Sequence, residues 1–282
     1  MATSEVLAIA DLQARDIDAC LRLSDEAGWN QNADDWRLFI EEGRTFGVRD
    51  ADGRLVATAA ALPYERDLAY LSMVLVTRSQ RRQGIATRLV DLCVEHIGRL
   101  GLVPVLDATP AGETVYSQQG FEVLFGLERW QGEAESTGTP APASVRPAAP
   151  GDTEVIAALD AGATGAPRRA IIADFAGRAG SHAFLLDDRS GFVLVRRGRR
   201  AFQLGPLVAG TPAHALKLLG AALGAVSGAV FIDVPVLQKS IGDWLAARGF
   251  TRQRSFSRMA FGRSQPFGAT DRLFVSAGPE FG

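Results

Sequence analysis

The chain has 282 residues, which is enough for two domains of ordinary size that each bury a core. Its hydrophobic content of 47% is that of a globular protein, and its formal net charge of −2 excludes a general attraction to nucleic acid. Two cysteines, Cys20 and Cys93, are too few for a disulfide framework, and the N-terminal residues contain no long apolar run. We therefore expect a cytoplasmic protein without a signal peptide or membrane anchor.

The first part of the chain predicts a strand, two helices and then three antiparallel strands. In the hairpin between the first two antiparallel strands, Gly53 supplies the positive φ that the turn needs. Trp29, Asn30 and Trp36 lie around the connection between the two helices, where the tryptophans either line a pocket or pack at its rim. In chain order the predicted elements cover residues 6–9, 16–24, 33–40, 45–48, 55–62 and 68–76.

An arginine-rich loop follows the third antiparallel strand and closes on Gly84, at the start of a helix that runs to about residue 100. The first amides of a helix have no acceptor within it and lie at the positive end of its dipole, so they can bind an anion. Gly84 lets the backbone approach a ligand closely, and Ala86 keeps the next turn narrow. The loop therefore predicts a phosphate site; the alternative is an ordinary basic surface turn. Its arginines are Arg78, Arg81 and Arg82.

A buried strand is predicted at residues 103–107, followed by a Pro/Gly turn and a short helix that Gly120 ends. Tyr116 lies on this helix, four residues before Gly120. Taken by itself, this tyrosine could be a core residue with its hydroxyl at the surface.

Two motifs in this half resemble those of the GNAT family of N-acetyltransferases. Arg81-x-x-Gly84-x-Ala86 resembles the loop with which that family holds the pyrophosphate of acyl-CoA, and the pattern Tyr-x-x-x-Gly-Phe that begins at Tyr116 is its second mark. In that family the tyrosine is often the general acid that returns a proton to the CoA thiolate. A phenol, with an ordinary pKa of about 10, stays protonated at neutral pH and can donate.

The resemblance implies an α/β fold over residues 1–130, with a mixed, mostly antiparallel sheet flanked by helices, and acetyl-CoA as cosubstrate. The pantetheine arm would pair with the end of strand 68–76 like an added strand, and the loop amides would hold the pyrophosphate. The implied cofactor-binding residues are Val74, Leu75, Val76, Arg81, Arg82, Gln83, Gly84, Ile85, Ala86 and Thr87.

The general base is not identified by the resemblance, because residues 70–76 contain no carboxylate. A water relay to Glu65, Asp67 or Asp107 stays open. The acceptor is expected in a cleft between the two helices and the turn after Asp107, so the substrate residues would be Trp29, Asn30, Trp36 and Asp107. Direct attack in a ternary complex needs no acyl-enzyme, and neither cysteine is placed to form one. The three histidines lack metal-ligand spacing, so no metal is expected; they are His96, His182 and His214.

Residues 131–144 contain no aliphatic residue larger than alanine and are expected to be a linker. Beyond it the architecture repeats, so we call residues 1–130 the first copy and residues 145–282 the second copy. A nine-residue step separates Gly from Arg in both copies, at Gly120 and Arg129 and at Gly249 and Arg258. The predicted helices and strands cover residues 153–161, 168–178, 183–186, 192–196, 201–209, 212–223, 230–234 and 239–248, and the basic run at 196–200 is expected to be a solvated hairpin turn.

The second copy departs from the first where chemistry would occur. Residues 209–215 contain no arginine, and Leu245 stands where Tyr116 stands in the first copy. We therefore expect the second copy to be catalytically silent. Residues 203–209, 231–235, 258–259 and 278–282 resemble the second domain of a bacterial group that joins an acetyltransferase domain to a divergent GNAT-like one. This resemblance covers nearly the whole chain. The implied function is acetyl transfer to a primary amine of a small molecule, amino acid or peptide, by a monomer or homodimer; the alternative is a non-catalytic acyl-CoA sensor or scaffold.

Overall fold

The structure is a computed structural model that describes residues 8–136 and 141–282. These residues form two compact units. Unit one contains the chain up to Pro63 together with Ala69–Pro104, and unit two contains Tyr64–Leu68 and Val105–Gly282. The end of the first copy, from Val105 onward, therefore belongs to the same unit as the second copy, and the division does not fall at the expected linker.

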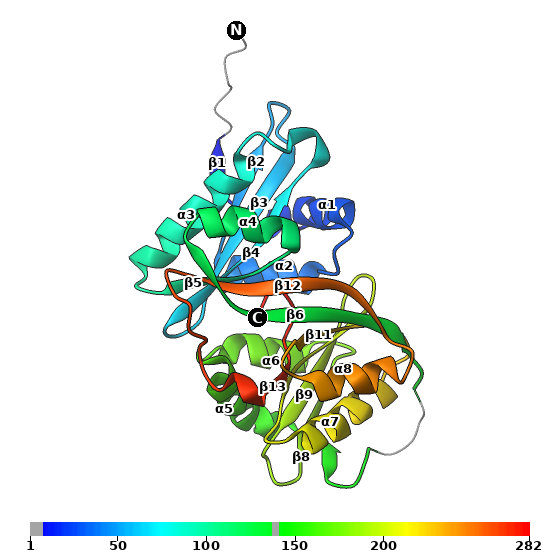
Figure 1. The fold of residues 1–282 in the computed structure, drawn as a ribbon. Helices are drawn as coiled ribbons and strands as arrows, with labels where there is room; N and C mark the ends of the chain where they lie inside the picture. Colours follow the sequence, from blue (N-terminus) through cyan, green and yellow to red (C-terminus); the bar gives the residue numbers. More distant parts are fainter. Residues whose placement is uncertain (1–7, 137–140) are drawn as a thin grey trace. The chain divides into compact units, whose positions relative to one another are not determined.

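Unit one contains an antiparallel sheet in which the strands follow one another in the order β1-β2-β3-β4. Every residue of β3 from Leu55 to Leu62 is buried, so this strand is covered on both faces. The cover comes from helices α1, α2 and α3, which pack on β2 and β3 (Figure 1). The bounds are β1 Ile9–Asp11, α1 Ile17–Ala27, α2 Ala33–Glu41, β2 Arg44–Arg49, β3 Leu55–Pro63, β4 Leu68–Val76 and α3 Ile85–Arg99.

Local sequence signals set the helix ends in this unit. α1 ends at Gly28, whose φ of 72° places it in the left-handed region that favours glycine. α2 begins with a capping box in which the amides and side chains of Asn32 and Asp35 bond reciprocally, each at 3.0 Å. The predicted elements are present, although the first strand is Ile9–Asp11 rather than residues 6–9, of which 6 and 7 lie outside the described residues.

Unit two contains one sheet in the order β5-β12-β6-β11-β10-β9-β8-β7, with β13 also paired to β10. Its strand pairs are antiparallel except for β10 and β11, which are parallel. Figure 1 shows α5 and α6 on one side of strands β8 to β11, and α7 and α8 on the other. The bounds are β5 Val103–Ala108, α4 Pro110–Gln118, β6 Phe121–Ala134, β7 Val145–Pro147, α5 Thr153–Thr164, α6 Arg169–Gly177, β8 His182–Leu186, β9 Phe192–Arg197, β10 Phe202–Val208, α7 Pro212–Gly224, β11 Gly228–Pro235, α8 Lys239–Ala246, β12 Thr251–Phe261 and β13 Leu273–Val275.

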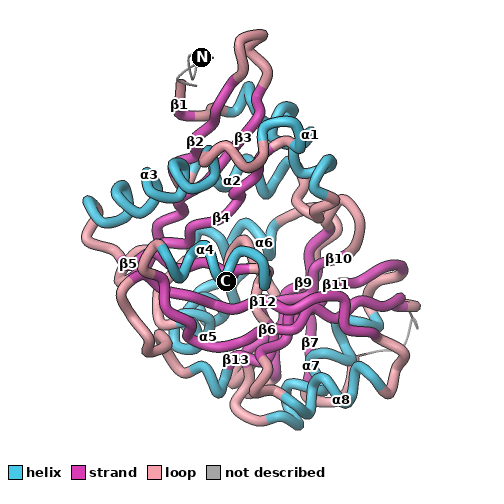
Figure 2. Tube along the Cα trace, turned by 45° about the horizontal axis from the view of Figure 1, so that its top comes forward, coloured by secondary structure: helices cyan, strands magenta, loops and turns pink. Residues whose placement is uncertain are grey.

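The two copies exchange their last long strands. β12, from the second copy, lies between β5 and β6 of the first copy, and β6 lies between β12 and β11 of the second copy. The two strands run side by side as the long green and orange ribbons of Figure 1, and Figure 2 shows the same pair beside β11, to which β6 is paired. Each copy therefore supplies a strand that completes the sheet of the other.

This exchange was not predicted from the sequence. Strands β6 and β12 were not expected at all, and the expected linker at residues 131–144 begins inside β6, which continues to Ala134. Residues 131–134 are ordered because their backbone pairs with β11, from Gln131 opposite Phe231 to Ala134 opposite Gly228. Residues 137–140 of that linker lie outside the described residues.

Candidate active site

The predicted phosphate loop lies in unit one, between the end of β4 and the start of α3. Gly84 precedes the helix with a φ of 77°, and the first helical hydrogen bond joins the Arg88 amide to the Gly84 carbonyl at 3.0 Å. The amides of Ile85 and Ala86 precede that bond, at the positive end of the helix. Residues 81–84, which include Arg81 and Arg82, are exposed. The turn therefore combines exposed arginines with the first amides of a helix, the two features that are expected of an anion site.

Glu26 orders the first residues of this loop, a role that was not predicted from the sequence. The Arg78 amide and the Thr77 hydroxyl each donate to the Glu26 carboxylate at 2.7 Å, and these two bonds lower the pKa of Glu26 below its ordinary value. The Arg81 guanidinium donates to the Val76 carbonyl at 3.1 Å. The loop is thus tied to α1 at one end and to β4 at the other. No sequence signal marks Glu26, because it lies 51 residues before Thr77.

Strand β4 carries a bulge just before its last three residues. Met73 has a φ of 54°, which is uncommon for a residue other than glycine, and the register with β3 shifts beside it. The Thr58 hydroxyl donates to the Met73 carbonyl at 2.8 Å and holds the bulge. Beyond it, Leu75 and Val76 still pair with β3.

The two cysteines are buried and free. Burial raises the pKa of the Cys20 thiol to about 12 and also raises the pKa of Cys93. Both thiols therefore stay protonated near neutral pH, and neither is an activated nucleophile.

The helix that carries Tyr116, α4, lies in unit two. It begins at the cap residue Thr109, whose hydroxyl accepts from the Gly112 amide at 3.3 Å, followed by Pro110 at its first position. Tyr116 is partly exposed, and its ring meets the Phe121 ring edge-on, with the centroids 5.9 Å apart. Tyr116 thus packs on Phe121 and keeps part of its surface exposed, which fits either of the two roles expected for it.

Asp107, a predicted substrate residue and candidate base, forms a buried ion pair with Arg258 of β12. The Arg258 guanidinium donates to both carboxylate oxygens, at 2.8 and 2.9 Å, and none of the Asp107 side chain is exposed. The two residues lie directly opposite each other in the sheet. A carboxylate with both oxygens engaged by a guanidinium is poorly placed to accept a proton from an amine or a water, so the structure argues against Asp107 as the base.

The second copy has an equivalent ion pair, in which the first copy supplies the arginine and the second copy supplies the aspartate. Arg129 of β6 donates to both oxygens of Asp233 on β11, at 2.8 and 2.7 Å, and Gln203 donates to the same carboxylate at 2.9 Å. The two arginines of the sequence repeat, Arg129 and Arg258, therefore each form an ion pair with the aspartate of the other copy. The two ion pairs give a structural reason for the nine-residue spacing of Gly and Arg that both copies share.

The other residues predicted for the acceptor cleft and for the general base differ in how far they are buried. Trp36 has no exposed surface; its indole donates to the Ser24 hydroxyl at 3.1 Å and its ring packs on Phe39, so it is a core residue and does not line an open cleft. Trp29 is half-buried and Asn30 is buried. Glu65 and Asp67, the remaining candidates for the base, are exposed in the turn between β3 and β4.

In the second copy, β13 pairs with the end of β10, the strand that corresponds to β4 in the first copy. β10 and β11 pair as far as Leu204 and Ile232, and beyond that point β13 pairs with β10 at Leu207 and Val208. The Ser276 amide then donates to the Asp233 carbonyl of β11 at 2.8 Å. In the first copy the corresponding edge is the end of β4, the predicted partner of pantetheine. The second copy has a strand of its own on that edge.

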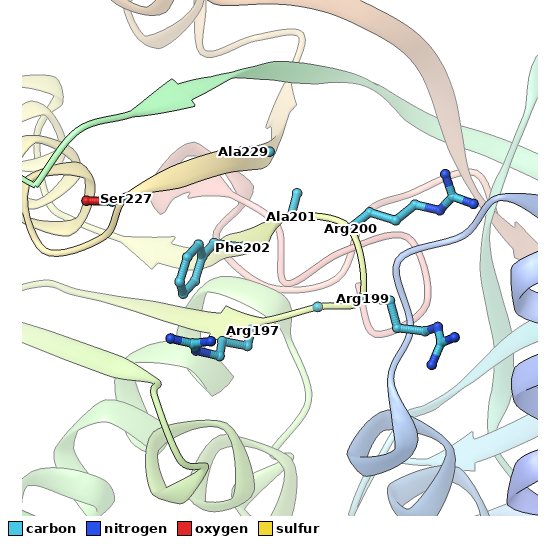
Figure 3. Close-up of a pocket in the computed structure, with 8 residues that line it drawn as sticks. Arg197, Arg199, Arg200, Ala201, Phe202, Ser227 and Ala229 are labelled. Atoms are coloured by element: carbon cyan, nitrogen blue, oxygen red, sulfur yellow. The ribbon is translucent and has the colours of Figure 1, made fainter.

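The basic run at residues 196–200 is a hairpin, as expected, but its first arginine is not solvated. Arg196 is buried and donates to the Ala277 carbonyl and the Glu280 carboxylate. A pocket of ≈ 220 Å³ lies at this hairpin, with the Arg197 guanidinium beside the Phe202 ring (Figure 3). None of the predicted site residues lines it.

Within the described part of the chain, no group of histidine, cysteine or carboxylate side chains has the arrangement of a metal site. The described helices include none with the length and apolar character needed to cross a membrane.

Comparisons with known proteins place both halves in one family. The model described as "Acetyltransferase (GNAT) family" matches residues 11–121, and the model described as "Acetyltransferase (GNAT) domain" matches residues 156–275. Holothin acyltransferase of Pseudoalteromonas sp. (strain SANK 73390) is 27% identical over 263 residues, which cover 89% of this chain and 88% of that protein.

Solved structures share the fold over nearly the whole chain. A protein of Pyrococcus horikoshii superposes with a TM-score of 0.84 at 19% identity, covering 100% of this chain and 98% of that one. The tandem GNAT protein from the clavulanic acid biosynthesis pathway superposes with a TM-score of 0.63 at 16% identity, covering 90% and 98%. The predicted α/β fold with two GNAT-like domains is thereby confirmed. The chain belongs to the GNAT family of N-acetyltransferases, in the group that carries two GNAT domains in tandem.

Proposed function

We propose that this protein transfers an acetyl group from acetyl-CoA to a primary amine of a small molecule, amino acid or peptide, by direct attack in a ternary complex. The observation that supports the proposal is the turn from β4 into α3, where Gly84 and the exposed Arg81 lie next to the first amides of a helix, an arrangement that suits an anion. That site suits the pyrophosphate of coenzyme A, and the end of β4 suits the pantetheine arm.

Tyr116 is the general acid in this proposal, and returns a proton to the CoA thiolate as the amine takes the acetyl group. Glu65 and Asp67 are the candidates for a base that acts through water, because Asp107 is engaged by Arg258. Trp29 and Asn30 remain the proposed acceptor residues.

The proposal is tested by measuring thiol release from acetyl-CoA with a panel of amines. The panel should include holothin, after which one relative is named, together with small amines, amino acids and short peptides. Turnover with any amine separates an enzyme from an acyl-CoA sensor. Binding of acetyl-CoA with no turnover on any amine would favour the sensor, and absence of binding would favour a scaffold.

Calorimetry should show one acetyl-CoA bound per chain. The second copy has no arginine in residues 209–215, and β13 already pairs with the backbone edge at Leu207 and Val208. A stoichiometry of two would contradict this assignment and would mean that β13 is displaced from β10.

Replacing Gly84 by alanine should weaken acetyl-CoA binding by about 5- to 30-fold. A left-handed conformation costs a residue with a Cβ atom about 1–2 kcal/mol, so the variant relaxes away from the φ of 77° that shapes the loop. Gly101→Ala is a matched control, because Gly101 lies just beyond the other end of α3 with a φ of 72°, and a Cβ at either glycine meets no atom within 4 Å.

Both glycine variants should lower the melting temperature to a similar extent, whereas only Gly84→Ala should raise the Kd for acetyl-CoA in calorimetry. Equal effects of the two variants on that Kd would show that the loop is not the binding site.

A further inference from the structure

The second copy has a structural role in the proposed chemistry of the first. We propose that β12 positions the helix that carries Tyr116, through Ser257 and Phe261, so that these two are positioning residues for acetyl transfer. The inference rests on the proposed role of Tyr116 as the acid, and it assigns to the catalytically silent copy a part in the reaction.

The first contact joins α4 directly to β12. The Ser257 hydroxyl donates to the Glu113 carboxylate in the first turn of the helix. Glu113 and Tyr116 are three residues apart and therefore lie on the same face of α4. The hydrogen bond thus fixes the face from which the phenol projects.

The second contact runs through a row of aromatic rings. The Tyr116 ring meets Phe121 edge-on, and Phe121 in turn meets Phe261 of β12 edge-on with the centroids 5.5 Å apart. Gly120, where the chain turns from α4 into β6, has a φ of 94°, and a Cβ there would lie 3.1 Å from the Phe261 ring. Phe261 therefore packs against both the turn and the residue that supports the tyrosine.

The helix α4 has no buried face of its own. No residue of α4 is buried, although its first turn is capped by Thr109. A helix without a buried face gains little stability from packing, so its orientation depends on specific contacts of the kind that Ser257 and Phe261 make.

β12 is a rigid support, because it is paired along both of its edges. Ser257 lies opposite Ala108 of β5 and opposite Gly126 of β6, and the next residue, Arg258, forms the buried ion pair with Asp107. A hydroxyl held in the middle of a sheet fixes its partner more precisely than one on a loop does.

The test is a double-mutant cycle that combines Ser257→Ala with Tyr116→Phe. Alone, Ser257→Ala should lower kcat about tenfold, within the 10²-fold that a misplacement of about 1 Å can cost. The KM for acetyl-CoA should not change, because the proposed pyrophosphate loop belongs to unit one. In the Tyr116→Phe background the same substitution should have no effect on kcat, because the group it positions is absent. Ser257→Thr keeps a hydroxyl and should restore kcat.

Ser255→Ala is the matched control, since Ser255 lies two residues earlier on the same strand and is exposed. It should leave kcat and the melting temperature unchanged. Phe261→Leu provides a second variant of the positioning contacts, and should likewise lower kcat only when Tyr116 is present. Melting temperatures of all variants separate lost positioning from lost folding.

Three results would overturn the inference: no change in kcat for Ser257→Ala, an equal fall in both backgrounds, or failure of Ser257→Thr to restore activity. If Tyr116→Phe itself leaves turnover unchanged, the acid role in the proposed function fails first, and the inference falls with it. Loss of kcat in Tyr116→Phe together with an unaffected Ser257→Ala would instead leave the proposed function standing and remove the inference alone.

Discussion

Replacing Tyr116 by phenylalanine should lower kcat for acetyl transfer by roughly 10²- to 10⁴-fold, the range that general acid catalysis contributes. The substitution removes one hydroxyl and keeps the ring that packs on Phe121, so neither the helix nor the fold should change. The KM for acetyl-CoA should stay the same, because Tyr116 is not among the residues proposed to bind the coenzyme. Steady-state kinetics with an amine found in the panel would measure both quantities.

The pH profile separates a proton donor from a packing residue. A phenol with an ordinary pKa of about 10 loses the proton that it must donate as the pH rises, so the native enzyme should lose activity on the alkaline side, whereas Tyr116→Phe should lack that limb. Ser117→Ala, on the exposed neighbouring position of α4, should behave as the native enzyme does. Unchanged turnover of Tyr116→Phe at every pH would show that Tyr116 is not the acid.

Replacing Arg129 by alanine should destabilise the protein by about 3–5 kcal/mol, as expected when one partner of a buried ion pair is removed. The Arg129 and Asp233 side chains are only 8% and 1% exposed, so the aspartate left behind would be a buried charge with Gln203 as its remaining donor. Urea unfolding, followed by circular dichroism, would measure the change in the free energy of unfolding.

Arg252→Ala provides the control for Arg129→Ala, because Arg252 of β12 is paired with Glu128 of the neighbouring strand β6 but is 65% exposed. A surface ion pair contributes only about 0–1 kcal/mol, so this variant should unfold almost as the native protein does. Equal destabilisation by the two variants would mean that burial does not govern the contribution of the Arg129–Asp233 pair.

The features that could be predicted from the sequence are those set by residues close together in the chain. The turn into α3 was predicted because Gly84 and its arginines are adjacent in the chain, and the structure has the predicted strand, loop and helix there. α4 was placed because Gly120 ends it and Tyr116 precedes that end. These features depend on residues a few positions apart, whose conformations are fixed by their own backbone and cap preferences.

The remainder depends on partners that are distant in sequence. Nothing near Arg129 shows that it bonds to Asp233, 104 residues later, and nothing near Ser257 indicates Glu113. Trp36 was expected near a cleft because it follows a loop. Its side chain is instead on the buried face of α2, in the core of unit one. The repeat of Gly and Arg was the one signal that pointed to the exchange, and the pairing itself could only be seen in three dimensions.

The exchange of strands also determines when the protein can complete its fold. During synthesis β5 and β6 leave the ribosome long before β12, since Thr251 follows Ala134 by 117 residues (251 − 134). At roughly 5–20 residues per second, the two strands wait on the order of 10 s with the space between them unfilled. Unpaired strand edges of this kind attract other chains. The nascent polypeptide therefore passes through a stage exposed to aggregation, and this stage ends when β12 of the second copy has been synthesised.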